Sequence, residues 1–174
     1  MTRIAGQRMR ILGKPVHFLL PLMLAGAVLL AVSAQAADFK WLTISGKIRS
    51  ESGSIFYTAG DMAATPGTEI VTSTPWTTGK TVFRGALLRD ILKDVGASGK
   101  LLKVSASDGF TVEIPVADAE KYDVILAYKM NGEWLERGVY APFWVIYPFD
   151  AHKELADRKF YARAIWQVTD IVVE

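Results

Sequence analysis

The chain has 174 residues with no cysteine and two histidines, and its 20 basic and 18 acidic side chains give a formal net charge of +2. Without cysteine it forms no disulfide bond, and with His152 as the one histidine after residue 36 the composition disfavours a zinc or iron site built on His and Cys. No serine lies in a G-x-S-x-G motif, so the composition favours ligand binding over covalent catalysis.

Residues 1–36 have the pattern of a secretory signal peptide. Four basic residues and no acidic residue flank an apolar run at 16–32, and Ala34 and Ala36 supply the small residues of a cleavage site. We therefore expect export, with the mature chain starting at Ala37. The run approaches the length of a membrane span, so an uncleaved anchor is the alternative, against which His17 and Pro21 inside the run argue.

Cleavage would change the charge of the chain, because it removes four positive charges and no negative one and leaves residues 37–174 near −2. The positive charge belongs to the targeting segment and gives no basis for nucleic-acid binding. The remaining chain, about 138 residues, suits one domain with its own core. That domain must be held together by packing alone, without disulfides.

The first half of this domain is predicted to form strands followed by one helix. Apolar and polar residues alternate at 39–48, and shorter strands are predicted at 54–59 and 68–74, with a turn-rich connector at 60–67. From Phe83 the spacing of apolar residues becomes helical, and Gly96 marks the end of this helix. Its apolar face consists of Leu87, Leu88, Ile91, Leu92 and Val95.

The second half contains two hairpin signals, Asp108-Gly109 and Asn131-Gly132, each between runs of alternating residues. We predict one compact, mostly-β domain of the α+β class. The elements expected here are strands at 101–107 and 110–115, strands at 124–130 and 133–138, a short apolar strand at 143–147, a short helix at 150–158 and a closing strand at 164–173.

Four segments, which cover most of residues 69–173, carry a resemblance to a known family. They are VTSTPWTTGKTVFRGALLRDIL, VSASDGFTVEIPVADAEKYDVILAYKMNG, GVYAPFWVIYPFD and YARAIWQVTDIVV. In this order they resemble the oxidoreductase molybdopterin-binding domain of the sulfite oxidase type. The resemblance implies an α+β domain with mixed sheets around a pocket for a pterin cofactor.

The chain departs from this family at the metal ligand. In catalytic members a cysteine thiolate binds molybdenum just before the W-x-G segment, and here Val71, Thr72, Ser73 and Thr74 occupy these positions. A hydroxyl cannot replace a soft thiolate without a large loss of metal affinity, so we do not expect molybdenum. Ser73 as a metal ligand is the alternative, since serine ligates molybdenum in an unrelated enzyme class.

The chain is similar to a small, exported, cysteine-free subgroup of the family. Its characterised members are periplasmic, bind a reduced pterin without molybdenum and control a membrane-bound diguanylate cyclase/phosphodiesterase through its periplasmic domain. The likeness implies a periplasmic pterin-sensing regulator of cyclic-di-GMP turnover. The alternatives are a molybdopterin-dependent periplasmic oxidoreductase and an interaction module that binds no small molecule.

A pterin site needs an aromatic or guanidinium face for stacking and a carboxylate opposite the amino and ring N–H donors. Trp76, in a polar loop, is the first stacking candidate, or else a loop residue anchored in the core. Arg84 could face a carbonyl or phosphate of the ligand, or be a solvated residue at the start of the helix. Asp108 could face the N–H donors, or stabilise only its own turn.

Tyr147 and Asp150 lie at the end of the strand at 143–147, where pockets open, and we expect one face of this strand to be core. Arg163 and Trp166 could complete the wall, with a core role for Trp166 as the alternative. Thr74 stands where a metal ligand would be. The predicted cofactor-binding residues are Thr74, Trp76, Arg84, Asp108, Tyr147, Asp150, Arg163 and Trp166, with no catalytic residue and no metal ligand.

Overall fold

Two β-sheets and a few short helices make up residues 40–174, the part of the chain that the computed structural model describes. The predicted signal peptide, its cleavage site and the apolar run at 16–32 lie outside the described residues. In chain order the elements are β1 (Lys40–Gly46), β2 (Ser54–Thr58), α1 (Ala59–Ala64), β3 (Gly67–Ser73), β4 (Lys80–Leu87), α2 (Leu88–Asp94), β5 (Leu101–Ala106), β6 (Thr111–Pro115), α3 (Val116–Lys121), β7 (Ile125–Met130), β8 (Glu133–Trp134), β9 (Trp144–Ile146), the 3₁₀ turn η1 (Lys153–Leu155), α4 (Arg158–Arg163) and β10 (Val168–Val173).

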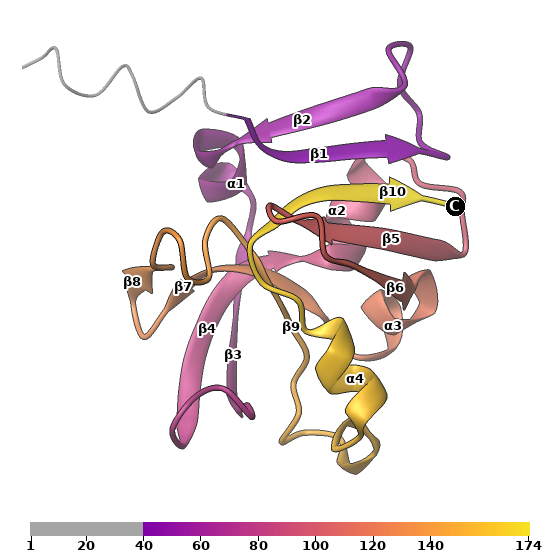
Figure 1. Ribbon diagram of the computed structural model, residues 1–174. Coiled ribbons are helices and arrows are strands. Elements are labelled where there is room, and N and C mark those ends of the chain that lie inside the picture. Colours follow the sequence, from indigo (N-terminus) through magenta and orange to yellow (C-terminus); the bar gives the residue numbers. More distant parts are fainter. Residues whose placement is uncertain (1–39) are drawn as a thin grey trace, which may run out of the picture. The chain divides into compact units, whose positions relative to one another are not determined.

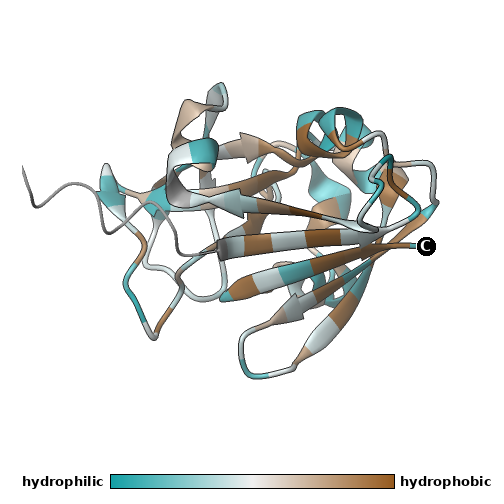
Figure 2. Cartoon of the chain, turned by 90° about the horizontal axis from the view of Figure 1, so that it is seen from above, coloured by the Kyte–Doolittle hydropathy of each residue, from teal (hydrophilic) through white to brown (hydrophobic). Residues whose placement is uncertain are grey.

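The first sheet has the strand order β2-β1-β10-β5-β6. Its centre is the C-terminal strand β10, which lies between β1 and β5 (Figure 1) and pairs in parallel with β1 and antiparallel with β5. Apolar and polar residues alternate along its strands (Figure 2), so Leu102, Val104 and Ala106 of β5 are buried while the residues between them are partly exposed. The alternation is that of a sheet with one face on the core.

The second sheet has the order β3-β4-β7-β8, and β9 also pairs with β7. Strand β4 is bonded on both sides, to β3 and to β7. At Gly85 the strands β4 and β7 approach so closely that a β-carbon would meet the carbonyl of Leu126. Only glycine fits this position of β4.

Two clusters of buried apolar residues lie on opposite faces of β9. Phe143, Val145 and Tyr147 belong to the larger cluster, and Trp144 and Ile146 to the smaller one. The expectation that one face of this strand is core was therefore incomplete, because both faces are. Tyr147 is completely buried for this reason.

The predicted helix exists but begins later than its apolar spacing suggested. Residues from Phe83 to Leu87 belong to β4, and α2 begins at Leu88. The helical end at Gly96 is confirmed, with a φ of +61° at that glycine. Pairing with β3 and β7 keeps Phe83 in a strand. The spacing of apolar residues along the sequence does not indicate this pairing.

The short helices are where the sequence-based predictions were least accurate. The connector at 60–67 contains α1, capped by the reciprocal hydrogen bonds of Thr58 and Asp61. The helix predicted at 150–158 is only the turn η1, followed by α4, and α3 was not predicted. The closing strand starts at Val168, so Trp166 lies in a loop. No helix within residues 40–174 is long and apolar enough to cross a membrane.

Candidate functional site

A cavity of about 330 Å³ opens where the loop after β3, the β5–β6 hairpin and the segment between α4 and β10 meet. Its volume is at the lower end of the range of small-molecule sites, about 300–1,000 Å³. Three predicted site residues, Trp76, Asp108 and Trp166, line it together. The full lining consists of Trp76, Asp108, Phe110, Tyr161, Ala162, Ala164, Ile165 and Trp166.

The wall of the cavity is aromatic. Trp76 lies 5.4 Å from Trp166 and 6.3 Å from Tyr161 between ring centroids, both nearly edge to face, and 5.9 Å from the buried Trp144. Trp76 is half-buried and packs against both core clusters. Trp76 therefore anchors its loop in the core and also lines the cavity, while its role as a stacking residue for a ligand stays a prediction.

Thr74 shapes the loop that presents Trp76. Its hydroxyl oxygen accepts a hydrogen bond from the Trp76 backbone N–H at 3.2 Å and shares a second one with the Thr77 hydroxyl at 2.9 Å. This buried threonine does not line the cavity. Its contacts fix the position of Trp76 relative to the end of β3.

The segment that carries Trp166 is tied to the β5–β6 hairpin. Ser107 donates its backbone N–H to the Gln167 carbonyl at 2.9 Å and its hydroxyl to the Gln167 side-chain oxygen at 2.7 Å. Gln167, directly before β10, has a φ of +55°, a sparsely populated backbone conformation that keeps this residue out of the strand. These bonds hold the two sides of the cavity together.

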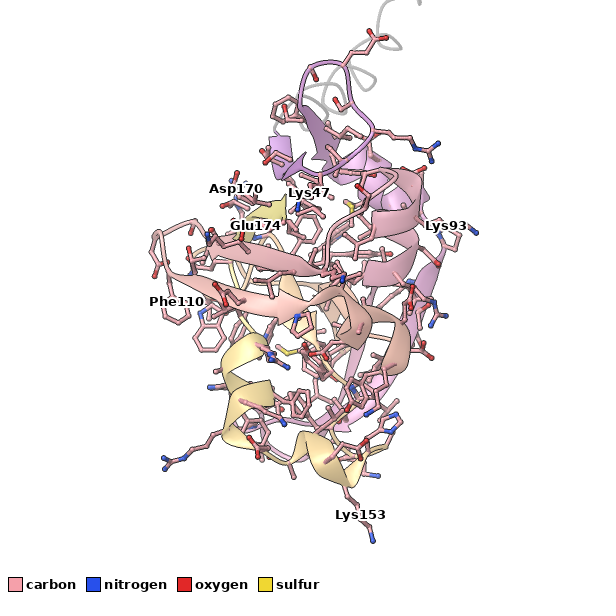
Figure 3. The ribbon with its side chains drawn as sticks, turned by 90° about the vertical axis from the view of Figure 1, so that its right-hand side faces the viewer. Lys47, Lys93, Phe110, Lys153, Asp170 and Glu174 are labelled. Carbon is pink, nitrogen blue, oxygen red and sulfur yellow. The ribbon has the colours of Figure 1, made fainter. Side chains whose placement is uncertain are left out.

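Asp108 and Phe110 form the rim of the cavity. The Asp108 carboxylate accepts a hydrogen bond from the Phe110 backbone N–H at 2.9 Å, across Gly109 with its φ of +87°. Asp108 takes part in no salt bridge within residues 40–174. Phe110 lies at the tip of the hairpin (Figure 3) and is 59% exposed, so most of its ring is open to solvent or to a ligand.

Several polar groups of the lining residues are available to a ligand. The indole N–H groups of Trp76 and Trp166 and the hydroxyl of Tyr161 have no hydrogen-bond partner in the described part of the chain. No buried side-chain N or O atom there lacks a partner, so these three groups are in contact with solvent. The lining residues therefore carry three solvent-accessible neutral donors in addition to the Asp108 carboxylate.

Two other predicted site residues, Tyr147 and Arg163, converge on Asp118 instead of on the cavity. The Arg163 guanidinium lies 2.8 Å from the Asp118 carboxylate, and the Tyr147 hydroxyl donates to the same oxygen at 3.0 Å. Burial, together with the Asp118 charge, raises the pKa of Tyr147 well above its usual value. The trio joins α3, α4 and the end of β9, so its evident role is structural.

Asp150 fixes the end of β3. Its carboxylate accepts hydrogen bonds from the Ser73 backbone N–H at 3.0 Å and from the Ser73 hydroxyl at 3.2 Å. In return, the Asp150 N–H donates to the Thr72 hydroxyl at 3.0 Å. The hydroxyls of Thr72 and Ser73, which the resemblance to the family aligns with the metal ligand, are thus hydrogen-bonded within the protein.

Arg84 lies away from the cavity, on β4. It forms an exposed ion pair with Glu69 at 3.4 Å, and the Tyr128 hydroxyl and the Glu69 carboxylate raise the pKa of its guanidinium. A ligand-binding role for Arg84, Tyr147, Asp150 or Arg163 stays a prediction.

The donor chemistry of the site suits an organic ring better than a metal or a phosphate. Within residues 40–174 no group of three or more His, Cys, Asp or Glu side chains could hold a metal ion. The lining includes no basic side chain. What it offers are aromatic faces, neutral donors and one carboxylate, which fit the ring of a pterin.

Sequence reasoning missed Phe110, Tyr161 and the small residues of the lining. Phe110 had a signal, since it is a large apolar residue directly after a tight-turn dipeptide, where it has no strand neighbour to cover it. Tyr161 had none, because α4 was not predicted.

A model of the oxidoreductase molybdopterin-binding domain matches residues 28–149, well over half of the chain. Among solved structures, the sulfane dehydrogenase SoxCD from Paracoccus pantotrophus is similar, with a TM-score of 0.60 and 18% sequence identity over 77% of this chain. At this identity the likeness shows the fold, and this chain covers only 38% of that one. No curated protein sequence matches the chain. The mostly-β fold agrees with both findings, and the chain belongs to the oxidoreductase molybdopterin-binding domain family.

Proposed function

We propose that this domain binds a reduced pterin in the cavity between Trp76, Asp108 and Trp166, without molybdenum. One observation carries the proposal: an aromatic cavity with one carboxylate in its lining adjoins the loop that presents Trp76, and this loop contains hydroxyl residues and no cysteine. The aromatic faces would stack on the pterin ring, and the Asp108 carboxylate would accept from its amino and N–H groups. The ligand would also cover part of the exposed Phe110 ring.

We propose further that the protein acts in the periplasm as a regulator of a membrane diguanylate cyclase/phosphodiesterase. The signal-peptide pattern of residues 1–36 and the resemblance to cysteine-free, exported members of the family support this role. Such a regulator needs a ligand whose binding changes the surface of the protein. It does not need a catalytic group. A rim residue such as Phe110 suits this need, because its exposure would differ between the free and the bound protein.

The ligand is tested on protein purified from the periplasm of its native host. Acid extraction should release a fluorescent pterin at about one per chain, and metal analysis should find no stoichiometric molybdenum. Protein carrying Trp166→Ala should lose the pterin, whereas Trp134→Ala, which removes a half-exposed tryptophan that does not line the cavity, should keep it. Molybdenum at about one per chain would contradict the proposal.

The regulatory role needs a separate experiment. Cyclic-di-GMP should change when the gene for this protein is deleted, and the wild-type gene should restore it while the Trp166→Ala variant should not. The purified protein should also bind the isolated periplasmic domain of the enzyme in a pterin-dependent way. Unchanged cyclic-di-GMP after deletion would argue against regulation without affecting the ligand assignment.

Family membership favours one further candidate, a molybdopterin-dependent oxidoreductase. In that case Ser73 is the one hydroxyl with a claim to the metal, although it donates to Asp150. Reconstitution with the complete cofactor should then give turnover with an artificial electron donor, and Ser73→Ala should abolish it. Reconstituted protein that stays inactive would leave the pterin-binding role.

A further inference from the structure

Strand β3 lies at one edge of the second sheet and pairs on one side only, with β4. Successive residues of a strand direct their backbone N–H and C=O groups alternately to its two sides. The Ser73 N–H donates to the Asp150 carboxylate at 3.0 Å and so points away from β4. Two and four residues earlier, Val71 and Glu69 therefore also direct their N–H and C=O groups to the side away from β4.

The neighbouring strand supports the same orientation. Val71 lies opposite Val82 in the register of β3 and β4. The Val82 N–H donates to the side-chain oxygen of Asn131 at 3.1 Å, and the Val82 carbonyl accepts from the Asn131 N–H at 2.8 Å. Val82 thus uses both backbone groups on the side of Asn131. Val71 and Val82 therefore form a non-hydrogen-bonded pair, in which the Val71 groups face outward.

The outward backbone groups of β3 are open. Within residues 40–174, the N–H and C=O groups of Glu69 and Val71 have no hydrogen-bond partner. The Val71 side chain is 57% exposed, so the described part of the chain leaves the edge accessible there. A row of unpaired N–H and C=O groups along a strand edge can pair with a further strand.

The other sheet edges offer less to an added strand. β3 has seven residues, whereas β2 and β6 have five each and β8 has two. Backbone groups at both ends of β2 are already bonded to side chains, since the Ser54 carbonyl accepts from two serine hydroxyls and the Thr58 N–H donates to Asp61. β6 ends at Pro115, which has no N–H to donate.

The charge of Glu69 indicates what kind of strand fits. Its carboxylate is exposed, and its ion-pair partner Arg84 lies across on β4, on the side away from the open edge. A second copy of β3, paired antiparallel through the open groups of Glu69 and Val71, would place the two Glu69 carboxylates opposite or diagonal to each other, which is unfavourable. A strand with Lys or Arg opposite Glu69 gains an attractive cross-strand pair instead.

We propose that the open edge of β3 is a docking site for an extended segment of a partner protein, which joins the second sheet as a further strand. Hydrogen bonds to the backbone of Glu69 and Val71 hold the segment, and its Lys or Arg opposite Glu69 and its β-branched residue opposite Val71 give specificity. Neither Glu69 nor Val71 lines the aromatic cavity, so this site does not depend on the ligand proposed for the cavity.

The probe is the synthetic peptide acetyl-Thr-Val-Ile-Lys-Thr-amide, which in antiparallel pairing places its Val opposite Val71 and its Lys opposite Glu69. Added to the purified protein at low salt and up to millimolar concentration, it should shift the amide NMR signals of Glu69 and Val71 in a saturable way and slow their hydrogen exchange. The same peptide methylated on the backbone nitrogens of Val and Lys lacks the necessary donors and should not bind. A peptide with Glu in place of Lys should bind about threefold or more weakly.

Two protein variants test the backbone and the charge separately. Val71→Pro removes an N–H that the sheet does not use, so the fold should persist while peptide binding is lost. Val71→Thr keeps this N–H and should bind within about twofold of the wild type. Glu69→Lys should reverse the preference between the Lys and the Glu peptide, and it decides the matter if Val71→Pro does not fold. Glu113→Lys, on the exposed face of β6, is the matched charge control and should leave the preference unchanged.

Three results overturn the proposal. The first is the absence of peptide-dependent shifts at Glu69 and Val71, and the second is equal binding of the methylated peptide. The third is protection of the Val71 amide that grows with protein concentration in the absence of peptide, because this would show that a second copy occupies the edge. None of these results bears on pterin binding, which the extraction from native protein tests by itself.

Discussion

The indole rings of Trp76 and Trp166 meet nearly edge to face, with centroids 5.4 Å apart and planes at 74°. One ring comes from the loop after β3 and the other from the loop before the last strand. The edge of one ring meets the face of the other, and both residues line the cavity. This pair is the feature on which the ligand assignment depends most directly.

Trp166→Ala should weaken pterin binding by about 10- to 100-fold, because loss of a stacking face costs about 1–3 kcal/mol. Trp166→Phe should restore most of the affinity, since a flat ring remains. Trp134, which packs against Tyr128 and meets Trp41 edge to face, provides the control, and Trp134→Ala should leave affinity unchanged. Titration calorimetry measures all three, and equal losses in the two alanine variants would refute the site.

Tyr147→Phe should lower the free energy of unfolding by about 1 kcal/mol at neutral pH, the usual value of one hydrogen bond. Pterin affinity should not change, because the hydroxyl contacts Asp118 and not the cavity. An affinity loss above tenfold in folded protein would restore Tyr147 to the binding residues. Urea denaturation and calorimetry give the two quantities.

The same tyrosine predicts a loss of stability at high pH. Burial raises the pKa of Tyr147 in the folded state, so above about pH 10 only the unfolded chain releases this proton. Its contribution is fully present below that pH and declines as the pH rises toward the folded-state pKa. Urea denaturation from pH 8 to 11 should show a decline that is smaller in Tyr147→Phe, and identical slopes would contradict the assignment.

Thr72→Val should destabilise the domain by about 1–3 kcal/mol, although the two side chains have similar shapes. Thr72 is completely buried, and its oxygen accepts from the Asp150 N–H, which valine would leave unpaired. The control is Val71→Thr on the same strand, which is 57% exposed and should change stability by less than about 0.5 kcal/mol. Thermal and urea denaturation compare the two, and similar effects would show that the Thr72 hydrogen bond contributes little.

Gly85→Ala should prevent stable folding or reduce stability by several kcal/mol, because a β-carbon there meets backbone atoms of Leu126 and Ala127, which side-chain motion cannot relieve. Gly60→Ala tests the reverse case. Gly60 lies in α1, where a β-carbon has only an ordinary contact with Thr58, so alanine should be neutral or stabilise by up to about 1 kcal/mol. A soluble, cooperatively folding Gly85→Ala variant would disprove the close strand contact.

The fold was predictable from sequence where the information is local. Alternation located β1, β2, β3 and β5, and the turn dipeptides located both hairpins, with Asn131 and Gly132 at φ values of +51° and +88°. The boundary between β4 and α2 was not predictable in this way. Phe83 is kept in a strand by partners on both sides, and one of these, β7, lies far along the chain.

For the site, the sequence predicted the types of residue better than the positions of their side chains. Trp76 stood out because it lies in a polar loop where no apolar pattern predicts a core residue. Asp108 stood out because it lies in a tight turn. Arg163 shows the limit of such reasoning, since its sequence neighbours line the cavity while its own side chain is bound by Asp118. That pairing depends on a helix, α3, whose sequence carried no recognised start signal.

The position of β10 in the middle of the first sheet sets an order of assembly. Within the first sheet, strand β1 meets β5 only through β10, so the pair β1–β2 and the pair β5–β6 stay unconnected until β10 is available. A chain that stops before Val168 would expose two unpaired strand edges and be prone to aggregate. Completion of this sheet therefore waits for the synthesis of β10, and loss of residues 168–174 would damage the centre of the sheet instead of trimming its edge.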